Sequence, residues 1–289
     1  MYNLVHVGIH KSGSTLLQKE IFPKIKNYTY LGFLSENKYS DEIRYLQSCS
    51  DLDFDENKIK NLINFFQNFV KENKLLVSSE AFTGNISPQF FGTGIFIDLI
   101  SKRIKKYIPN PKIVLILRNQ RDAIYSLYKD DIQFGYICTF DDWIKERLKT
   151  NSLEYFKYDK ILSYYQNFFG EENVKTFFYE NIFKRKNGMM DFLNQLDIDT
   201  DLTQDDISNL INSSKANFGN SNIVTSISRL LNHVIKTKLS QSYTDGKYNL
   251  YVYNFWRYFL SKKISRLLGN NEIPNNTNLN ALLKKLNEN

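Results

Sequence analysis

The sequence predicts an α/β fold, in which helices flank a parallel sheet of about four or five strands and the C-terminal region is helical. Two observations carry this prediction. Short apolar runs bounded by turn residues alternate with segments of helical period, which is typical of a parallel sheet flanked by helices. After Met189 no further apolar strand pattern occurs, and the remaining segments have helical or loop character.

Strands are expected where short apolar runs are bounded by turn residues. The segment KIVLILR is the most hydrophobic of these runs, as expected of a strand that is buried on both faces. The expected strands cover residues 3–8, 75–79, 112–118 and 173–180.

Helices are expected between and after these strands. Between residues 55 and 74, for example, Ile59, Leu62, Ile63 and Phe66 recur at helical spacing. Further helices are expected to begin near residues 14, 122 and 141, and to cover residues 94–107, 222–238 and 253–268.

The chain of 289 residues is long enough to bury its core within a single domain. We expect one domain over residues 1–289, with an α/β core at 1–200 and a helical extension at 201–289. The spacing of Cys49 and Cys138 is not typical of metal ligands or of a redox pair. Neither a signal-peptide pattern nor a run of about 18 apolar residues occurs, so a soluble cytoplasmic protein is expected.

Charge is unevenly distributed along the chain. The formal net charge is +7, yet residues 1–214 carry a net charge of −1. From Lys215 to the C-terminus there are 11 basic and 3 acidic residues. A basic excess fits an anionic ligand, a nucleic acid or a membrane surface, so the net charge alone does not choose a function.

The segment GIHKSGST, residues 8–15, lies between the first expected strand and a helix, which is the context of a phosphate-binding loop. In such a loop, successive backbone N–H groups and the helix dipole face an anion. The glycines and the final threonine match the nucleoside-triphosphatase pattern G-x-x-x-x-G-K-S/T, but Ser14 occupies the lysine position and the lysine is Lys11. The alternative is a turn that binds no ligand.

This loop resembles the 5′-phosphosulfate-binding loop of the sulfotransferases that use 3′-phosphoadenosine 5′-phosphosulfate (PAPS). In that family an arginine at a strand end and a serine eight residues later hold the 3′-phosphate. LILRNQRDAIYSLY supplies Arg118 and Ser126 at this spacing. A guanidinium can bind a phosphate with two parallel hydrogen bonds, and a hydroxyl on the next helix adds one more. An ordinary strand-to-helix junction is the alternative.

The resemblance extends from Leu115 to Glu180, where SLY, TFDDW and FFYEN are similar to segments of bacterial sulfotransferases that are thought to act on glycans. The family's glycine-rich basic closing loop is not evident, and Lys215 in NSSKANFG is the candidate substitute. For Tyr179 the alternative is a core aromatic residue. The roles that the resemblance implies are a bond from Lys11 to the bridging oxygen, binding of the 5′-phosphosulfate by Ser12, Gly13, Ser14 and Thr15, and an approach of Tyr179 to the adenine.

Sulfuryl transfer to a hydroxyl needs a base near the acceptor oxygen. The second expected strand ends in Ser78, Ser79 and Glu80, at the edge of the sheet where open α/β folds bind ligands. We expect Glu80 to be this base, because glycan and protein-tyrosine sulfotransferases use a glutamate; a surface or helix-capping carboxylate is the alternative. His10 is expected to shape the loop rather than to remove the proton.

The expected activity is therefore in-line, metal-free transfer of a sulfuryl group from PAPS to a hydroxyl, leaving 3′,5′-adenosine bisphosphate. In this interpretation residues 1–200 bind the nucleotide and residues 201–289 lie on the acceptor side. The expected acceptor is a glycan or glycolipid, with no nucleic-acid partner. The basic C-terminal helices would associate peripherally with the inner face of the membrane.

Two alternatives stay open. One is a P-loop kinase or other nucleotide-binding protein that uses ATP or GTP with magnesium. The other is a non-catalytic basic module that binds RNA or a membrane surface through YNFWRYFLSKKISRLL, residues 253–268, where aromatic and basic residues are mixed.

Overall fold

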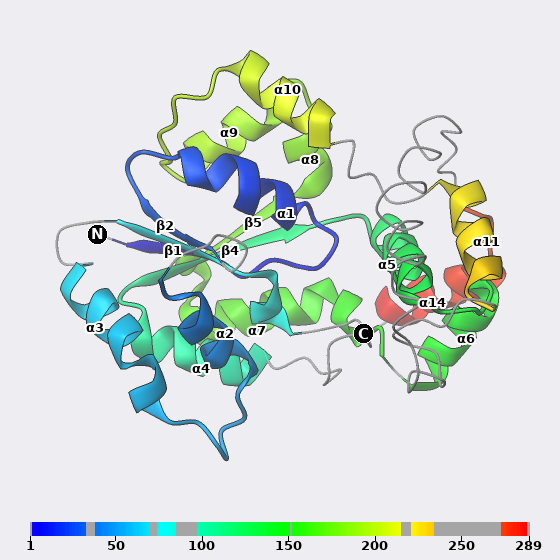
Figure 1. Ribbon diagram of the computed structural model, residues 1–289, viewed down its shortest axis with the longest axis horizontal. Coiled ribbons are helices and arrows are strands. Elements are labelled where there is room, and N and C mark those ends of the chain that lie inside the picture. Colours follow the sequence, from blue (N-terminus) through cyan, green and yellow to red (C-terminus); the bar gives the residue numbers. More distant parts are fainter. Residues whose placement is uncertain are drawn as a thin grey trace. The chain divides into compact units, whose positions relative to one another are not determined.

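The computed structural model forms two compact units (Figure 1). The first unit comprises Met1–Asn85, Gly94–Arg118 and Tyr158–Ile211 and contains the sheet. The second comprises Ile86–Thr93, Asn119–Lys157 and Asn212–Asn289. The residues that the structure describes are 2–32, 38–69, 74–84, 97–150, 152–214, 221–233 and 273–287.

The first unit is built on a five-stranded parallel sheet, which confirms the predicted α/β fold. The strand order is β2-β3-β1-β4-β5. Strand β2 was not predicted, because TYLG is short and lies at the edge of the sheet, where β3 is its one partner among the described strands and its first two residues are half-buried. The strands are β1 (Asn3–His6), β2 (Thr29–Gly32), β3 (Leu75–Ser78), β4 (Pro111–Leu117) and β5 (Val174–Phe178).

Helices cover both faces of this sheet (Figure 1). One face carries α1 (Ser14–Leu16), which continues through a π-helical turn, η1 (Leu17–Ile21), and a 3-10 turn, η2 (Phe22–Lys24). The same face carries α8 (Tyr179–Phe183), α9 (Gly188–Gln195) and α10 (Gln204–Ser214). The opposite face carries α2 (Ser40–Ser48), α3 (Lys60–Phe69), α4 (Ile97–Tyr107) and α7 (Tyr158–Phe169).

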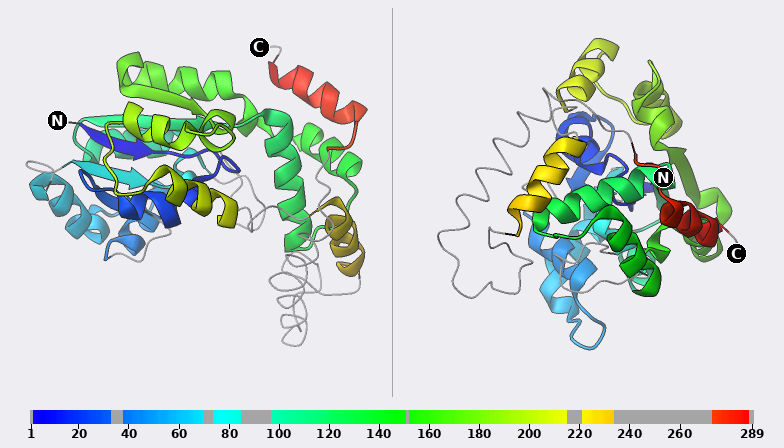
Figure 2. Two further views of the ribbon diagram at one scale, coloured as in Figure 1. Left: turned by 90° about the horizontal axis from the view of Figure 1, so that it is seen from above. Right: turned by 90° about the vertical axis from the view of Figure 1, so that its right-hand side faces the viewer.

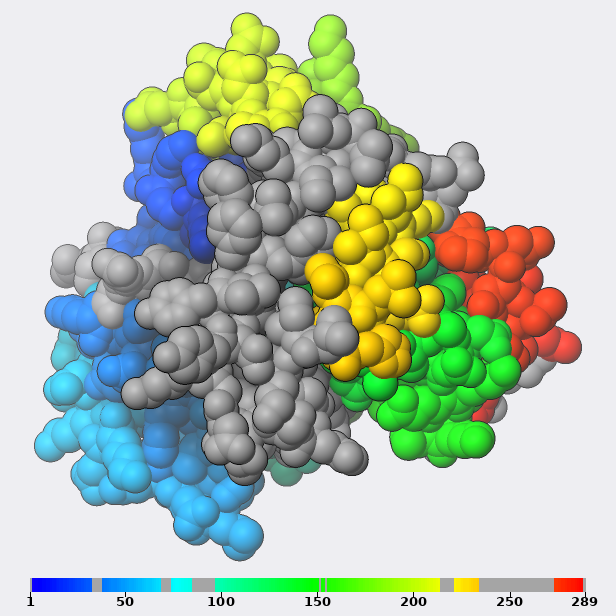
Figure 3. Space-filling view, turned by 45° about the vertical axis from the view of Figure 1, so that its right-hand side comes forward, coloured from blue at the N-terminus to red at the C-terminus, as the bar shows by residue number. Residues whose placement is uncertain are grey.

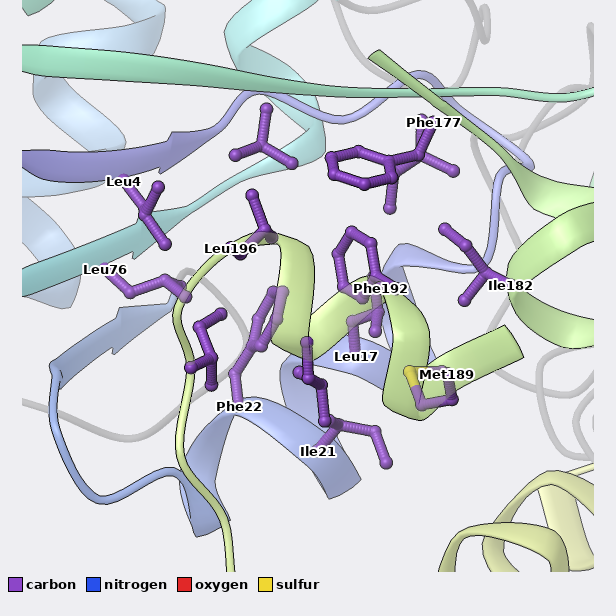
Figure 4. Packing of buried hydrophobic residues seen from close by; sticks show 14 of the residues in the cluster. Leu4, Leu17, Ile21, Phe22, Leu76, Phe177, Ile182, Met189, Phe192 and Leu196 are labelled. Carbon is purple, nitrogen blue, oxygen red and sulfur yellow. The ribbon is translucent and has the colours of Figure 1, made fainter. Parts of the chain in front are cut away.

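Alternate strand residues face the two layers of helices, because successive side chains of a strand point to opposite faces. Leu4 of β1 and Leu76 of β3 belong to a buried cluster that also contains Leu17 and Phe22 from the first helical segment and Phe192 from α9 (Figure 4). This cluster fixes the first helical segment against the sheet, and with it the loop that precedes the helix.

The described part of the second unit is helical and has an aromatic core. Its helices are α5 (Gln120–Phe134), α6 (Phe140–Thr150), α11 (Asn222–Leu231) and α14 (Thr277–Asn287). Figure 2 shows these four helices together, and Figure 3 shows that α11 reaches the surface beside them. Within the core, Asp131 accepts hydrogen bonds from Trp143 Nε1 (2.9 Å) and Arg147 Nη2 (2.8 Å).

The predicted helices at 94–107, 122 and 141 correspond to α4, α5 and α6, and the first part of the helix predicted at 222–238 is α11. The helix predicted at 253–268 lies outside the described residues. Within the described ranges, every helix is too short or too polar to cross a membrane.

Candidate active site

The sequence-predicted site residues of the first unit directly follow strand ends. Residues 7–13 follow β1, Glu80 comes two residues after β3, Arg118 follows β4 and Tyr179 follows β5. Because the strands are parallel, these segments meet at one edge of the sheet, the edge at which open α/β folds bind ligands.

The loop after β1 passes through three residues with left-handed backbone. The φ angle is 65° at Gly8, 70° at Lys11 and 88° at Gly13. The backbone N–H of Ser12 donates to the carbonyl oxygen of Ile9 (3.2 Å), and the buried Ser12 hydroxyl donates to the same oxygen. The loop is therefore closed by its own hydrogen bonds, one of which uses a side chain that the sequence assigned to ligand binding.

Both glycines lie where no side chain fits. A Cβ at Gly8 would lie 2.5 Å from the Cα of Glu80, and a Cβ at Gly13 would lie 2.6 Å from the ring of Phe183. Carbon atoms do not approach this closely, so only glycine permits both packing and left-handed backbone at these positions. The loop thus packs directly on Glu80 on one side and on Phe183 on the other.

The helical segment that follows begins at Ser14. The Gly13 carbonyl accepts from the N–H groups of Leu16 (3.1 Å) and Leu17 (3.3 Å). The Ser14 hydroxyl is buried and has no hydrogen-bond partner among the described residues, whereas Thr15 is exposed. Buried polar atoms are normally paired, so the Ser14 hydroxyl is available for a ligand.

Arg118 lies against this loop. Its Nη1 donates to the carbonyl oxygen of Lys11 (2.8 Å), and its guanidinium carbon lies 4.7 Å from the centre of the Tyr179 ring. The Tyr179 ring also lies 4.7 Å from the ring of Phe183. Within the described chain, the buried Nε of Arg118 has no hydrogen-bond partner. The structure therefore brings Lys11, Arg118 and Tyr179 together, and it gives Arg118 a loop-holding contact that the sequence did not predict.

Glu80 begins the turn η4 (Glu80–Thr83) on the other side of the loop. Its side chain is 31% exposed, so it is accessible to a substrate. Its backbone carbonyl accepts from Thr83 Oγ1 (3.1 Å). His10 is an ionisable neighbour of Glu80: its Nδ1 lies 3.9 Å from Glu80 Oε2, and its Nε2 lies 2.9 Å from the Gly84 carbonyl oxygen. His10 thus joins the loop to Gly84.

A buried polar network behind the loop was not predicted. His6 Nδ1 lies 2.7 Å from Ser78 Oγ, and Gln18 Nε2 donates to the same oxygen (2.9 Å). Burial lowers the pKa of His6 to about 3, so the ring is neutral at pH 7. A signal was present in the sequence, because a histidine within an apolar strand needs a buried hydrogen-bond partner.

Tyr158 is a second residue that the sequence reasoning missed. It begins α7, and its buried hydroxyl lies beside Arg118, where burial raises its pKa above the usual value. Ser126, predicted to assist Arg118, lies half-buried on α5 in the second unit. Lys215, the candidate for closing over the nucleotide, lies outside the described residues.

The parallel sheet has a glycine-containing loop after its first strand and charged side chains at the ends of neighbouring strands. This arrangement is typical of α/β proteins that bind a ligand at the carboxyl edge of the sheet. The family model described as "Sulfotransferase domain" matches residues 3–249, and the chain belongs to the sulfotransferase family. Its class is therefore that of the transferases that move sulfuryl groups.

The chain also has a match among solved structures. The crystal structure of a sulfotransferase from Alicyclobacillus acidocaldarius is 18% identical, and the match covers 70% of this chain and 83% of that chain with a TM-score of 0.46. No curated protein matches the chain.

Proposed function

We propose that this member of the sulfotransferase family transfers a sulfuryl group from PAPS to a hydroxyl group of a carbohydrate. One observation carries the proposal. The segment that contains Lys11 and the buried Ser14 hydroxyl is contacted by Arg118 at Lys11 and by Glu80 at Gly8. The loop thus carries a cation and an unsatisfied hydroxyl, and it packs on the residue that bears a carboxylate. Transfer from an anionic donor to a hydroxyl needs both a cation and a base.

The residues around the loop fit a donor that carries two phosphate groups. The Ser14 hydroxyl and Arg118 Nε are buried polar atoms without partners among the described residues, and a bound anion would satisfy them. We assign Ser12–Thr15 to the 5′-phosphosulfate, Arg118 to the 3′-phosphate and Tyr179 to the adenine. The assignment of Ser126 to the 3′-phosphate stays a prediction from the sequence.

The side chains then divide the chemistry between them. PAPS supplies a sulfuryl group attached to a phosphate that can depart. Glu80 removes the proton of the acceptor hydroxyl as its oxygen attacks. Lys11 donates a hydrogen bond to the departing phosphate oxygen and neutralises its developing charge. Arg118 holds the backbone of Lys11 in place through the 2.8 Å hydrogen bond. The proposal includes no metal ion.

The surroundings of residue 14 support PAPS over a magnesium-bound nucleoside triphosphate. In P-loop kinases a lysine at this position reaches the terminal phosphates. Here Ser14 is 2% exposed, and the lysine stands three residues earlier in left-handed backbone. Lys11 would therefore approach the donor from the loop rather than from the helix.

The proposed acceptor is a glycan or glycolipid, and the proposed location is the cytoplasm at the inner face of the membrane. The support is the 11 basic and 3 acidic residues after position 214, which favour an anionic acceptor or an anionic lipid surface. Incubation with labelled PAPS and either cell-envelope glycans or small phenols tests the acceptor class. Transfer to phenols alone would contradict a carbohydrate acceptor.

Isothermal titration calorimetry of the full chain tests the donor. We expect binding of 3′,5′-adenosine bisphosphate and weaker binding of ATP with magnesium. Arg118→Ala should lose about 2–4 kcal/mol of binding free energy, by analogy with removal of one partner of a buried charge pair. The matched control is Arg185→Ala, which removes an exposed arginine of the same unit. Tight binding of ATP with magnesium, without any response to the bisphosphate, would overturn the proposal in favour of a kinase.

A further inference from the structure

A buried hydrogen bond joins the helical segment after the loop to the end of strand β3. Gln18 Nε2 donates to Ser78 Oγ (2.9 Å), and the two residues are 60 positions apart in the sequence. Gln18 is 1% exposed, and Ser78, the last residue of β3, is fully buried. Gln18 also lies in the π-helical turn η1, and such turns are frequent at functional sites.

The two ends of this hydrogen bond lie close in the sequence to the two reacting groups of the proposed chemistry. Ser14, whose buried hydroxyl is assigned to the donor, precedes Gln18 by one helical turn. Glu80, the proposed base, follows Ser78 by two residues. The hydrogen bond therefore connects the helix that binds the donor to the strand that carries the base.

The end of β3 is held from both faces of the sheet. Ser78 pairs in register with His6 of β1, whose Nδ1 lies 2.7 Å from Ser78 Oγ. Ser79, the next residue, donates from Oγ to Oε1 of the buried Gln47 of α2 (2.7 Å). Successive side chains of a strand point to opposite faces, so a buried amide on each face fixes the two residues that precede Glu80.

We infer that Gln18 is a positioning residue that sets the separation between the bound donor and Glu80; this inference rests on the proposed function. Gln18 is too deeply buried to contact a substrate and acts through Ser78 and the helix that begins at Ser14. Transfer requires reacting atoms about 3–3.5 Å apart, and a displacement of about 1 Å can slow a reaction about 100-fold. Loss of the hydrogen bond would therefore slow transfer without removing any group that binds the donor.

Gln18→Met tests this role, because methionine is similar in size but cannot donate to Ser78. With labelled PAPS and 4-nitrophenyl β-D-glucoside as acceptor, we expect kcat for release of 3′,5′-adenosine bisphosphate to fall about 10- to 100-fold. The Kd of the bisphosphate, measured by calorimetry, should stay within about twofold, because the loop and Arg118 are unchanged. A Kd that rises in proportion to the loss of kcat would show that Gln18 supports donor binding and would contradict the inference.

Ser78→Ala removes the same hydrogen bond from the strand side, with a smaller change in volume. Its kcat should fall by about as much as that of Gln18→Met, again with an unchanged Kd for the bisphosphate. The double variant should lose no more activity than either single variant, because both substitutions remove one interaction. Losses that multiply in the double variant would show that the two residues act separately and would contradict the inference.

Asn3→Leu is the matched control, because Asn3 is 1% exposed and joins β1 to β3 at the opposite edge of the sheet. Its Oδ1 accepts from the N–H of Leu75 (3.0 Å), and its Nδ2 donates to the Pro109 carbonyl oxygen. Asn3→Leu should lower the urea midpoint of unfolding at least as much as Gln18→Met does, yet keep kcat within about twofold.

The outcomes separate this inference from the proposed function. Wild-type kcat in Gln18→Met, or an equal loss of kcat in Asn3→Leu, would overturn the role of Gln18 alone. A wild-type chain that neither binds the bisphosphate nor releases it from PAPS above the rate in buffer would overturn the proposed function and the role of Gln18 together.

Discussion

Three residues hold the loop after β1 in left-handed backbone, for different reasons. Gly8 and Gly13 have no room for a side chain, since Glu80 and Phe183 occupy the space. Lys11 has a side chain and still adopts φ of 70°. Left-handed backbone costs a residue other than glycine about 1–2 kcal/mol. Backbone strain in a loop at a candidate site indicates that the side chain of the strained residue has a function. In Lys11 the functional group would be the ammonium group.

Replacing Lys11 separates the backbone strain from the chemistry. Lys11→Gly and Lys11→Ala both remove the cation, so both should lower PAPS turnover by about 10²–10³-fold. Only glycine adopts φ of 70° without strain. The free energy of unfolding of Lys11→Gly should therefore be about 1 kcal/mol higher than that of Lys11→Ala. Urea titration compares the two stabilities. Equal stabilities would mean that the loop changes conformation in the alanine variant.

Glu80→Gln tests the proposed base. The amide keeps the shape of the side chain but cannot remove a proton, so turnover should fall by about 10²–10⁴-fold. Affinity for 3′,5′-adenosine bisphosphate, measured by calorimetry, should not change, because Glu80 is assigned to the acceptor. Glu172→Gln, at an exposed position of the same unit, is the control. Unchanged turnover in Glu80→Gln would remove Glu80 from the mechanism.

The residues that follow strand ends could be predicted from the sequence, because an apolar run defines each strand and parallel strands end at one edge. Glu80, Arg118 and the loop at residues 8–15 were found in this way. The hydrogen-bond partners of His6 and Arg118 could not be predicted, because each partner is distant in the sequence. Ser78 is 72 residues from His6, and Lys11 is 107 residues from Arg118.

At the scale of elements, local signals accounted for the helices better than for the edge of the sheet. Helix α5 has a clear start and end: the Asn119 side chain accepts from the N–H groups of Arg121 (3.0 Å) and Asp122 (3.3 Å), and Gly135 ends the helix with φ of 119°. Strand β2 has no comparable signal, because an edge strand of four residues is defined by its neighbour β3. Burial on both faces, rather than length, made β1, β3 and β4 predictable.

The N-terminal cap of α5 contributes to the stability of the second unit. Asn119→Ala leaves two N–H groups of the first turn without this partner and should lower the free energy of unfolding by about 1 kcal/mol. Asn119→Asp, which keeps an accepting oxygen, should cost much less. Urea titration followed by circular dichroism measures both. A loss of equal size in the two variants would mean that the cap is not the cause.

For the whole molecule, the net charge of +7 and the local charge at the candidate site are separate properties. Lys11 and Arg118 belong to the first 214 residues, whose net charge is −1. Binding of an anion at this site would depend on the loop backbone and two nearby cations, not on a basic surface. The pH dependence of stability also depends on a single side chain, because protonation of the buried His6 changes the free energy of unfolding.

Acid should destabilise the protein through His6. Burial lowers the pKa of His6 from 6.5 to about 3, so between these values the unfolded chain binds a proton that the folded chain does not. Above pH 6.5 His6 is neutral in both states and does not reduce the free energy of unfolding. Below pH 6.5 the free energy of unfolding falls by up to about 1.4 kcal/mol for each pH unit, until about pH 3.

Urea titrations between pH 7 and pH 5 measure this contribution. Carboxylates also weaken the fold in acid, so the test is the slope of the free energy of unfolding against pH, compared between variants. His6→Met removes the titrating ring and should reduce the slope below pH 6.5 by about 1.4 kcal/mol per pH unit. His233→Gln, at an exposed position, should keep the wild-type slope. Identical slopes in His6→Met and wild type would show that His6 takes up a proton in the folded chain, and would contradict its burial as a neutral ring.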